Sequence, residues 1–314
     1  MKKSKIFFSI SAVGSVIAPV AIAVSCNEKT NQNNIKKAAN EITTNIENFL
    51  SGTLANTPNI PTIDKNQIKS NVLNLLNTIN DISTKANTSI NYQSLSTFIN
   101  KVMNYYSTVF SSKITAALTR GLTGAINNNS NEFLEKLNNQ EFVDSEFNKI
   151  PGSSSFEQKY TELKQIINQV LDYIKNNIDN QTLINKYLDL YKKLIGFYSV
   201  IYPNIPMNNV LPNTANIAPS AQEIQFIKNS ITEATKNFNN QFDTVYKNEF
   251  KKNFVMINHE IKNEKDKFTL NEIYDVVLPI SKMIKYLVTN IDELTKLIDQ
   301  YLSFVSKTLK PANQ

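Results

Sequence analysis

Residues 220–262 read SAQEIQFIKNSITEATKNFNNQFDTVYKNEFKKNFVMINHEIK, and this stretch decides the fold class. Its apolar residues recur every three or four positions, which is the period of an amphipathic helix. The opening pattern Ser220-x-x-Glu223 is typical of a capping box. An unbroken helix of this length would measure about 65 Å at a rise of 1.5 Å per residue. The apolar stripe consists of Ile224, Ile227, Ile231, Ala234, Phe238, Phe242, Val245, Phe250, Phe254, Ile257 and Ile261.

The spacing of this stripe drifts between residues 242 and 250, and large aromatic residues stand where a coiled coil usually carries Leu. Both features favour packing within the protein's own bundle over a regular dimeric coiled coil. We therefore expect either an elongated bundle or two helical lobes joined around residues 202–219.

The helical period continues outward from this stretch, and runs of alternating polarity are too short to indicate a sheet. The predicted class is all-α, a multi-helix bundle. Further capping boxes are predicted at Ser154-x-x-Glu157 and Thr269-x-x-Glu272, and a kink or boundary is expected at Pro279. The expected organisation is an N-terminal helical region over 35–201, a Pro-rich connection over 202–219 and a C-terminal helical region over 220–314. Helices are predicted near 35–51, 64–82, 91–121, 133–137, 154–174, 181–202 and 292–310.

The composition excludes several classes of site. The chain of 314 residues has one Cys, one His, six Gly and no Trp. One Cys forbids an intramolecular disulfide framework and a Cys-rich zinc site, and one His forbids a His-based metal cage. Six Gly are too few for the phosphate-binding loops of a doubly wound α/β enzyme. Arg120 is the only Arg, and the bias toward Asn, Lys and Ile is best explained by A/T-rich codons.

The first 26 residues have the layout of a secretory signal. Lys2, Lys3 and Lys5 precede an uncharged apolar stretch that ends at the only Cys of the chain. Ala23 at −3 and Ser25 at −1 place Cys26 where a signal would be cut, although Leu is the commoner residue at −3. This arrangement resembles a bacterial lipobox.

The lipobox resemblance implies that the signal covers 1–25 and is cleaved between Ser25 and Cys26. It also implies that the Cys26 Sγ receives a diacylglycerol, and two acyl chains anchor stably where one does not. The alternatives are an uncleaved signal anchor and a chance Cys in an ordinary signal peptide. Residues 26–34 would then be the lipidated N-terminus and a flexible tether.

Removing residues 1–26 changes what the net charge implies about partners. Its three Lys and absent acids reduce the formal charge from +6 to +3, which gives no case for nucleic-acid binding. No later segment has an apolar run long enough to span a bilayer. We expect a protein tethered at its end and otherwise soluble.

The sequence contains no recognisable catalytic, metal-binding or phosphate-binding motif. His259-Glu260 begins like a zincin motif, but Asn263 stands where the second His is required. His259 is therefore interpreted as a solvated helix residue. Gly121-Leu122-Thr123-Gly124 lacks the Lys and the spacing of a phosphate loop and is interpreted as a helix connection.

The acidic clusters are equally unspecific. Glu260, Glu264 and Asp266 alternate with Lys, as at a solvated helix end. A second cluster could hold a divalent cation loosely but does not match a calcium loop; it consists of Glu141, Asp144 and Glu146. No catalytic, cofactor-binding or metal residues are predicted, and we expect a protein that is not an enzyme.

The connection over 202–219 carries the apolar segment that is expected to be most exposed. It holds several large apolar residues besides its prolines, and it is either a plain connection packed on the bundle or a binding loop. The apolar residues are Ile205, Met207, Val210, Leu211 and Ile217.

Taken with the Asn/Lys/Ile bias and the helical pattern, the signal with Cys26 resembles that of mycoplasma surface lipoproteins. The specific resemblance covers residues 1–26. It implies a protein on the extracellular face of a cell without a wall, in a family that includes adhesins, variable surface antigens, immunoglobulin-binding proteins, nucleases and transport-associated binding proteins. We expect a non-enzymatic ectodomain that contacts a host or neighbouring surface protein, with its oligomeric state open. The alternatives are a solute-binding lipoprotein of a transporter and a surface hydrolase.

Overall fold

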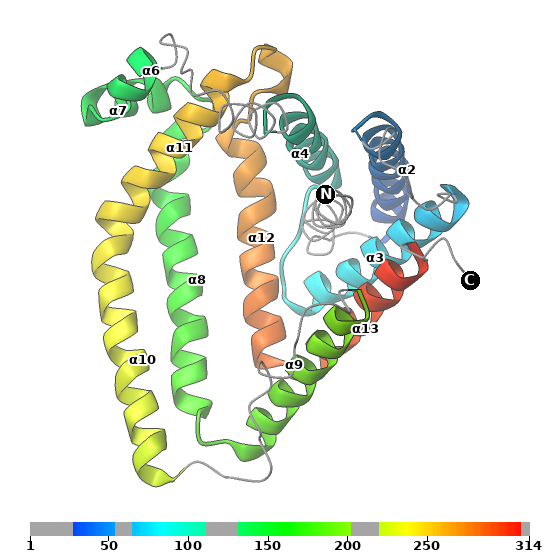
Figure 1. Ribbon diagram of the computed structural model, residues 1–314, viewed down its shortest axis with the longest axis vertical. Coiled ribbons are helices and arrows are strands. Elements are labelled where there is room, and N and C mark those ends of the chain that lie inside the picture. Colours follow the sequence, from blue (N-terminus) through cyan, green and yellow to red (C-terminus); the bar gives the residue numbers. More distant parts are fainter. Residues whose placement is uncertain (1–27, 54–64, 111–130, 202–219, 309–314) are drawn as a thin grey trace, which may run out of the picture.

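A computed structural model describes residues 28–53, 65–110, 131–201 and 220–308. Cys26, the segment 121–124 and the connection 202–219 lie outside these ranges. Within them every regular element is helical, which confirms an all-α multi-helix bundle (Figure 1). The α-helices are α2 (Glu28–Thr53), α3 (Lys65–Lys85), α4 (Tyr92–Tyr105), α6 (Asn131–Lys136), α7 (Gln140–Asn148), α8 (Phe156–Asn177), α9 (Gln181–Ile201), α10 (Ala221–Gln241), α11 (Lys247–Glu260), α12 (Leu270–Thr289) and α13 (Ile291–Thr308).

One aliphatic core lies among α2, α3 and α4, with contributions from α12 and α13. The apolar residues that recur at helical spacing in the predicted helices 35–51 and 64–82 lie in this core, because each helix presents one stripe at the 3.6-residue period. This core includes Ile35, Ile42, Ile68, Leu76, Ile79, Leu95, Ile99 and Met283.

A second core is rich in aromatic rings and joins α7, α8 and α11 to the start of α12. Phe147 meets Phe156 edge to face with 4.9 Å between ring centroids, and Phe156 stacks on Phe250 at 5.5 Å. Such offset and edge-to-face pairs stabilise beyond the area they bury, by about 0.5–1.5 kcal/mol each.

Both cores contain residues from before and after the connection 202–219, and α12 contributes to each of them. The predicted regions 35–201 and 220–314 therefore pack against one another, with α12 lying between α8 and α4 (Figure 1).

The deciding stretch is helical from Ala221 to Glu260, with a π-helical turn, η5, at Phe242–Tyr246 between α10 and α11. The turn coincides with the drift in apolar spacing, because a π-turn adds one residue and rotates the stripe. The predicted capping boxes at Ser220 and Thr269 are both formed.

The box predicted at Ser154 is wrong. Gly152 adopts a left-handed φ of 94°, and the chain then makes a short 3-10 turn, η3 (Ser153–Ser155). Ser155 therefore occupies the N-cap position of α8, where it makes no side-chain capping bond.

Three other features bear on the expectations from sequence. The expected tether is helical from Glu28, because extending an already packed helix costs little per residue. Helix α12 continues through Pro279, which excludes a boundary there and leaves the kink, the other expectation at this position, as a prediction. The short helix α7 was not predicted. Of the described helices, none combines the length and the apolar character that crossing a membrane requires.

Candidate functional site

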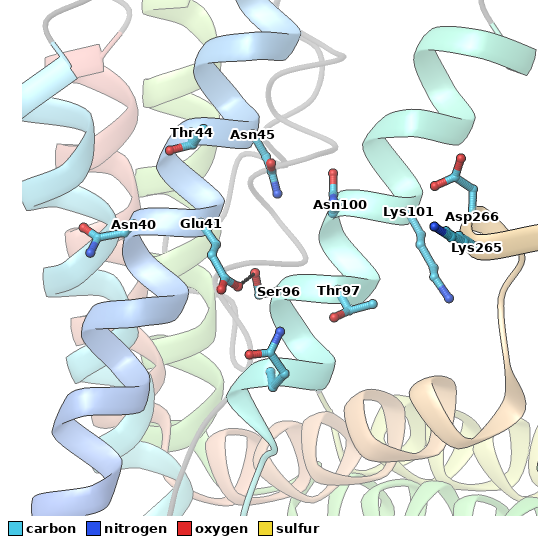
Figure 2. A pocket seen from close by; sticks show the side chains of 11 residues that line it. Asn40, Glu41, Thr44, Asn45, Ser96, Thr97, Asn100, Lys101, Lys265 and Asp266 are labelled. Atoms are coloured by element: carbon cyan, nitrogen blue, oxygen red, sulfur yellow. Dashed lines mark hydrogen bonds between the residues drawn. The ribbon is translucent and has the colours of Figure 1, made fainter. Parts of the chain in front are cut away.

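A polar cleft of about 480 Å³ lies between α2 and α4, and the 3-10 turn η6 (Glu264–Asp266) lies at one end of it (Figure 2). Both helices contribute side chains at helical spacing, so one face of each is turned toward the cleft. The lining residues are Asn40, Glu41, Thr44 and Asn45 from α2; Gln93, Ser96, Thr97, Asn100 and Lys101 from α4; and Lys265 and Asp266 from η6.

Polar contacts tie the two helices together across the cleft. The Ser96 hydroxyl donates to Glu41 Oε2 at 2.6 Å, the contact drawn between the helices in Figure 2. The Lys37 ammonium donates to the Gln93 side chain at 3.1 Å and lies 3.8 Å from Glu41. Ser96 is buried, so its hydroxyl and the Glu41 carboxylate satisfy one another where water is scarce.

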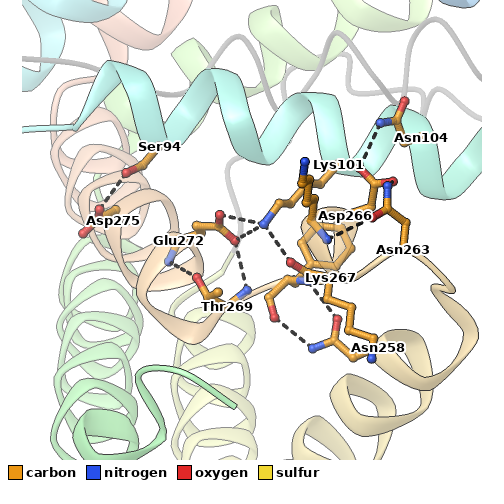
Figure 3. Close-up of polar contacts among 12 residues, drawn as sticks. Ser94, Lys101, Asn104, Asn258, Asn263, Asp266, Lys267, Thr269, Glu272 and Asp275 are labelled. Carbon is orange, nitrogen blue, oxygen red and sulfur yellow. Dashed lines mark hydrogen bonds and ion pairs between the residues drawn. The ribbon is translucent and has the colours of Figure 1, made fainter.

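Lys101 reaches out of the cleft toward the start of α12 (Figure 3). Its ammonium donates to both carboxylate oxygens of Glu272, at 2.7 and 2.9 Å, and to the Lys267 carbonyl at 2.7 Å. The side chain of Lys101 is 10% exposed and that of Glu272 is 19% exposed. Glu272 also accepts from the Thr269 N–H at 2.9 Å, so one carboxylate caps α12 and neutralises the lysine. Lys101 is therefore a structural cation.

The loop between α11 and α12 is held against α4 by further polar contacts. The Asn104 and Asn263 side chains both donate to the carboxylate of Asp266, at 3.5 and 2.9 Å. The Tyr105 hydroxyl donates to Glu260 at 3.0 Å, and burial followed by this contact raises the pKa of Tyr105 to about 12. These bonds fix the end of the cleft in place.

The remaining lining groups determine what the cleft can bind. Its amides and hydroxyls offer both donors and acceptors, and among the described residues the side chains of Asn45, Thr97 and Asn100 form no hydrogen bond. The lining contains no aliphatic or aromatic residue, so its apolar surface comes from the stems of polar and charged side chains. With seven amide or hydroxyl residues and four charged residues around it, the cleft suits a small polar ligand held by hydrogen bonds.

The residues that sequence patterns singled out do not assemble into one site. His259 is exposed on α11, as predicted, and stacks on the Phe133 ring with 3.4 Å between centroids. Asp144 pairs with Lys251 at 2.8 Å, and Glu146 pairs with Lys149, the C-cap residue of α7. In the described ranges, no three metal-ligating side chains gather in one place.

The residues around Glu260, which were predicted to form a solvated helix end, instead hold this segment against α4. Glu260 and Asp266 make contacts with α4, while Glu264 pairs with Lys267 within the loop. Cys26 and Ser25, the predicted lipidation and cleavage residues, lie outside the described residues, as does the connection 202–219.

Sequence reasoning missed the cleft. Gln93, Ser96, Thr97 and Asn100 recur at three- and four-residue spacing, which is the usual pattern of a solvated helix face. The same polar spacing on two helices that later pack together is the signal that could have found it.

No family model matches the chain, and no solved structure matches it. Among curated proteins, the chain is similar to the ookinete surface protein PIMMS43 of Plasmodium falciparum (isolate 3D7), with 27% identity over 193 residues. The alignment covers 54% of this chain and 36% of that protein, so the chain spans about a third of its relative's length. This similarity does not assign the chain to a family.

Proposed function

We propose that this chain is a surface protein, anchored in the membrane by a diacylglyceryl group on Cys26, whose helical body binds another macromolecule. The observation that carries the proposal is the sequence of residues 1–26, in which a basic start, an uncharged apolar stretch and small residues lead to the only Cys. The similarity to a surface protein supports a surface location.

The proposed partner is a host or neighbouring surface protein, and the proposed activity is binding without catalysis. Of the four charged side chains that line the cleft, Glu41 and Lys101 are engaged in contacts that hold helices together, which supports this view. A catalytic acid or base needs a group that is available to a substrate proton.

Surface proteolysis of intact cells, followed by membrane fractionation, tests the anchor. The wild-type chain should be in the membrane fraction and accessible to added protease. The variant Cys26→Ala should leave the membrane fraction. Retention of Cys26→Ala in the membrane would contradict lipid anchoring and favour an uncleaved signal anchor.

Incubation of the purified protein with host cells and matrix proteins tests the second half of the proposal. Saturable binding that a surplus of unlabelled protein displaces is the expected result. Absence of saturable binding to all of them would count against a host-contact role.

The cleft favours a second candidate function, a solute-binding lipoprotein. Its volume of about 480 Å³ would take a small polar solute. Calorimetric titration with a panel of amino acids and sugars tests this, using Asn45→Leu/Asn100→Leu to block the cleft and Asn176→Leu, on the exposed face of α8, as the control. A solute that binds wild type and the control but not the double variant would favour this function.

A further inference from the structure

The polar cleft is part of a groove between two parallel helices. Three side-chain contacts join α2 to α4 and the residue after it, and they follow one another in the same order along both segments. From residue 37 to residue 49, the first and last of these contacts, α2 advances by twelve residues, or about 18 Å at 1.5 Å per residue. The contacts are Lys37 with Gln93, Glu41 with Ser96, and Phe49 with Tyr106, whose ring centroids are 5.6 Å apart.

Amide and hydroxyl side chains line both walls of this groove (Figure 2). Each amide and each hydroxyl can both donate and accept hydrogen bonds. Because these groups recur every three or four residues, each helix presents them in a row along the groove. They are Asn45 and Thr97, which are half-buried, and Asn40, Thr44 and Asn100, which are exposed.

The cleft also carries two charged groups that a ligand can reach, and they are opposite in sign. The Glu41 carboxylate accepts one hydrogen bond from Ser96, and its side chain is 35% exposed. Since a carboxylate has about four acceptor positions, it keeps the capacity to accept from an ammonium. Lys265 of η6 is exposed and lines the cleft, and within the described ranges its ammonium forms no hydrogen bond and no ion pair.

The distance between these two charges follows from their places along α4. Glu41 lies at the level of Ser96. Asn104 bonds to Asp266, which directly follows Lys265 in η6. From residue 96 to residue 104, α4 advances by eight residues, or about 12 Å. The Asp266 carboxylate accepts from two amides, so Lys265 is the charged group at this end that has no partner of its own among the described residues.

These dimensions distinguish between classes of polar solute. The ammonium and carboxylate of a free amino acid are one residue apart, which is too close to reach both ends. A neutral sugar carries neither charge, and a ligand rich in phosphate would be repelled by Glu41 and Asp266. An extended peptide advances about 3.3–3.6 Å per residue, so three or four residues span about 10–14 Å. Its backbone N–H and C=O groups need hydrogen-bond partners, which the amides and hydroxyls of the groove supply.

We propose that the cleft binds an extended peptide of three or four residues, with its free ammonium at Glu41 and its free carboxylate at Lys265. The amides and hydroxyls of α2 and α4 hold the peptide backbone between these ends. Because no aliphatic or aromatic residue lines the cleft, recognition depends on the main chain and the two termini, and small side chains are accepted alike. The proposal rests on the second candidate function, that of a solute-binding lipoprotein, and names its solute.

The first test is calorimetric titration of the full chain, extracted in mild detergent, with tetraalanine as the probe. Tetraalanine with free termini should bind at one site. Acetylating its N-terminus or amidating its C-terminus should each weaken binding about 2- to 5-fold, because each change removes one charge that pairs with a partly exposed group. Asn45→Leu/Asn100→Leu should abolish binding, whereas the control Asn176→Leu should bind like wild type. Circular dichroism verifies that each variant keeps its helices.

The second test locates the carboxylate of the peptide. Lys265→Met should weaken the binding of tetraalanine about 2- to 5-fold but leave the binding of its C-terminal amide unchanged, because the amide has no charge for Lys265 to pair with. Lys262→Met is the matched control, since Lys262 is exposed on the same loop but does not line the cleft. This control should bind both probes like wild type.

Four outcomes would overturn the proposal. If an amino acid or a sugar binds in the cleft but tetraalanine at about 10 mM does not, the peptide is excluded and the solute-binding function stands. If none of these probes binds, both fail together. Binding of tetraalanine that persists in Asn45→Leu/Asn100→Leu would place the site elsewhere. Equal weakening of the free acid and the amide by Lys265→Met would exclude a carboxylate at Lys265.

Discussion

Replacing Lys101 by Met should lower the free energy of unfolding by about 3 kcal/mol. Met fills the volume of the lysine stem, so the change removes chiefly the ammonium and its bonds to Glu272 and the Lys267 carbonyl. An orphaned charge in a buried pair typically costs about 3–5 kcal/mol. Glu272 keeps the bond from Thr269 and its place at the N-terminus of α12, which favours a carboxylate and moves the cost to the lower end.

The assay is equilibrium unfolding in urea. The dependence of the unfolding free energy on urea concentration should be the same in wild type and variants, which tests two-state behaviour. Lys193→Met is the matched control, because Lys193 also contacts a carboxylate, Asp299, at 2.6 Å but with side chains 40% and 50% exposed. Exposed pairs contribute about 0–1 kcal/mol. The double variant Lys101→Met/Glu272→Gln should cost about 1–2 kcal/mol less than the sum of its single variants. A cost for Lys101→Met no larger than for Lys193→Met would refute the reasoning.

Two further predictions concern the backbone and the response to alkali. Gly152→Ala should lower the free energy of unfolding by about 1–3 kcal/mol, since φ is 94° and a Cβ would lie 2.6 Å from the Asn271 side chain. Gly196→Ala should raise the free energy of unfolding by about 0.5–1 kcal/mol, because Gly196 lies inside α9 with open space around it. Thermal unfolding that ranks the two variants in the opposite order would contradict the turn geometry. The free energy of unfolding should fall between pH 10 and 12, because burial raises the pKa of Tyr105 to about 12 while the unfolded side chain ionises near pH 10 and so releases its proton first. Urea titrations at several pH values should show a smaller fall for Tyr105→Phe than for wild type. The same fall in both proteins would count against the burial of Tyr105.

The helices themselves were predictable because their burial follows a local period. Ile68, Leu76 and Ile79 stand at helical spacing within the predicted helix 64–82, and each is fully or almost fully buried. Helix α7 was missed because only Val143 and Phe147 face inward from its nine residues, too few to show a period. The capping box at Ser154 failed because a left-handed Gly152 and a 3-10 turn shifted the cap by one residue, which no pattern of hydroxyl and Glu reveals.

Local sequence patterns could not predict the polar cleft, for a different reason. Lys101 and Glu272 are 171 positions apart, and each has an ordinary local interpretation, as a helix-face cation and as a capping residue. Only the packing of α4 against α12 makes them one buried pair, and the same packing turns the polar face of α4 toward η6.

The central claim is that Cys26 carries the lipid that holds this helical body at the cell surface. Mass spectrometry of the N-terminal peptide of the protein purified from its own membrane tests it most directly. The account predicts a mature chain that begins at Cys26 and carries a diacylglyceryl group on its sulfur. A chain that still begins at Met1, or an N-terminal Cys26 with an unmodified thiol, would contradict it.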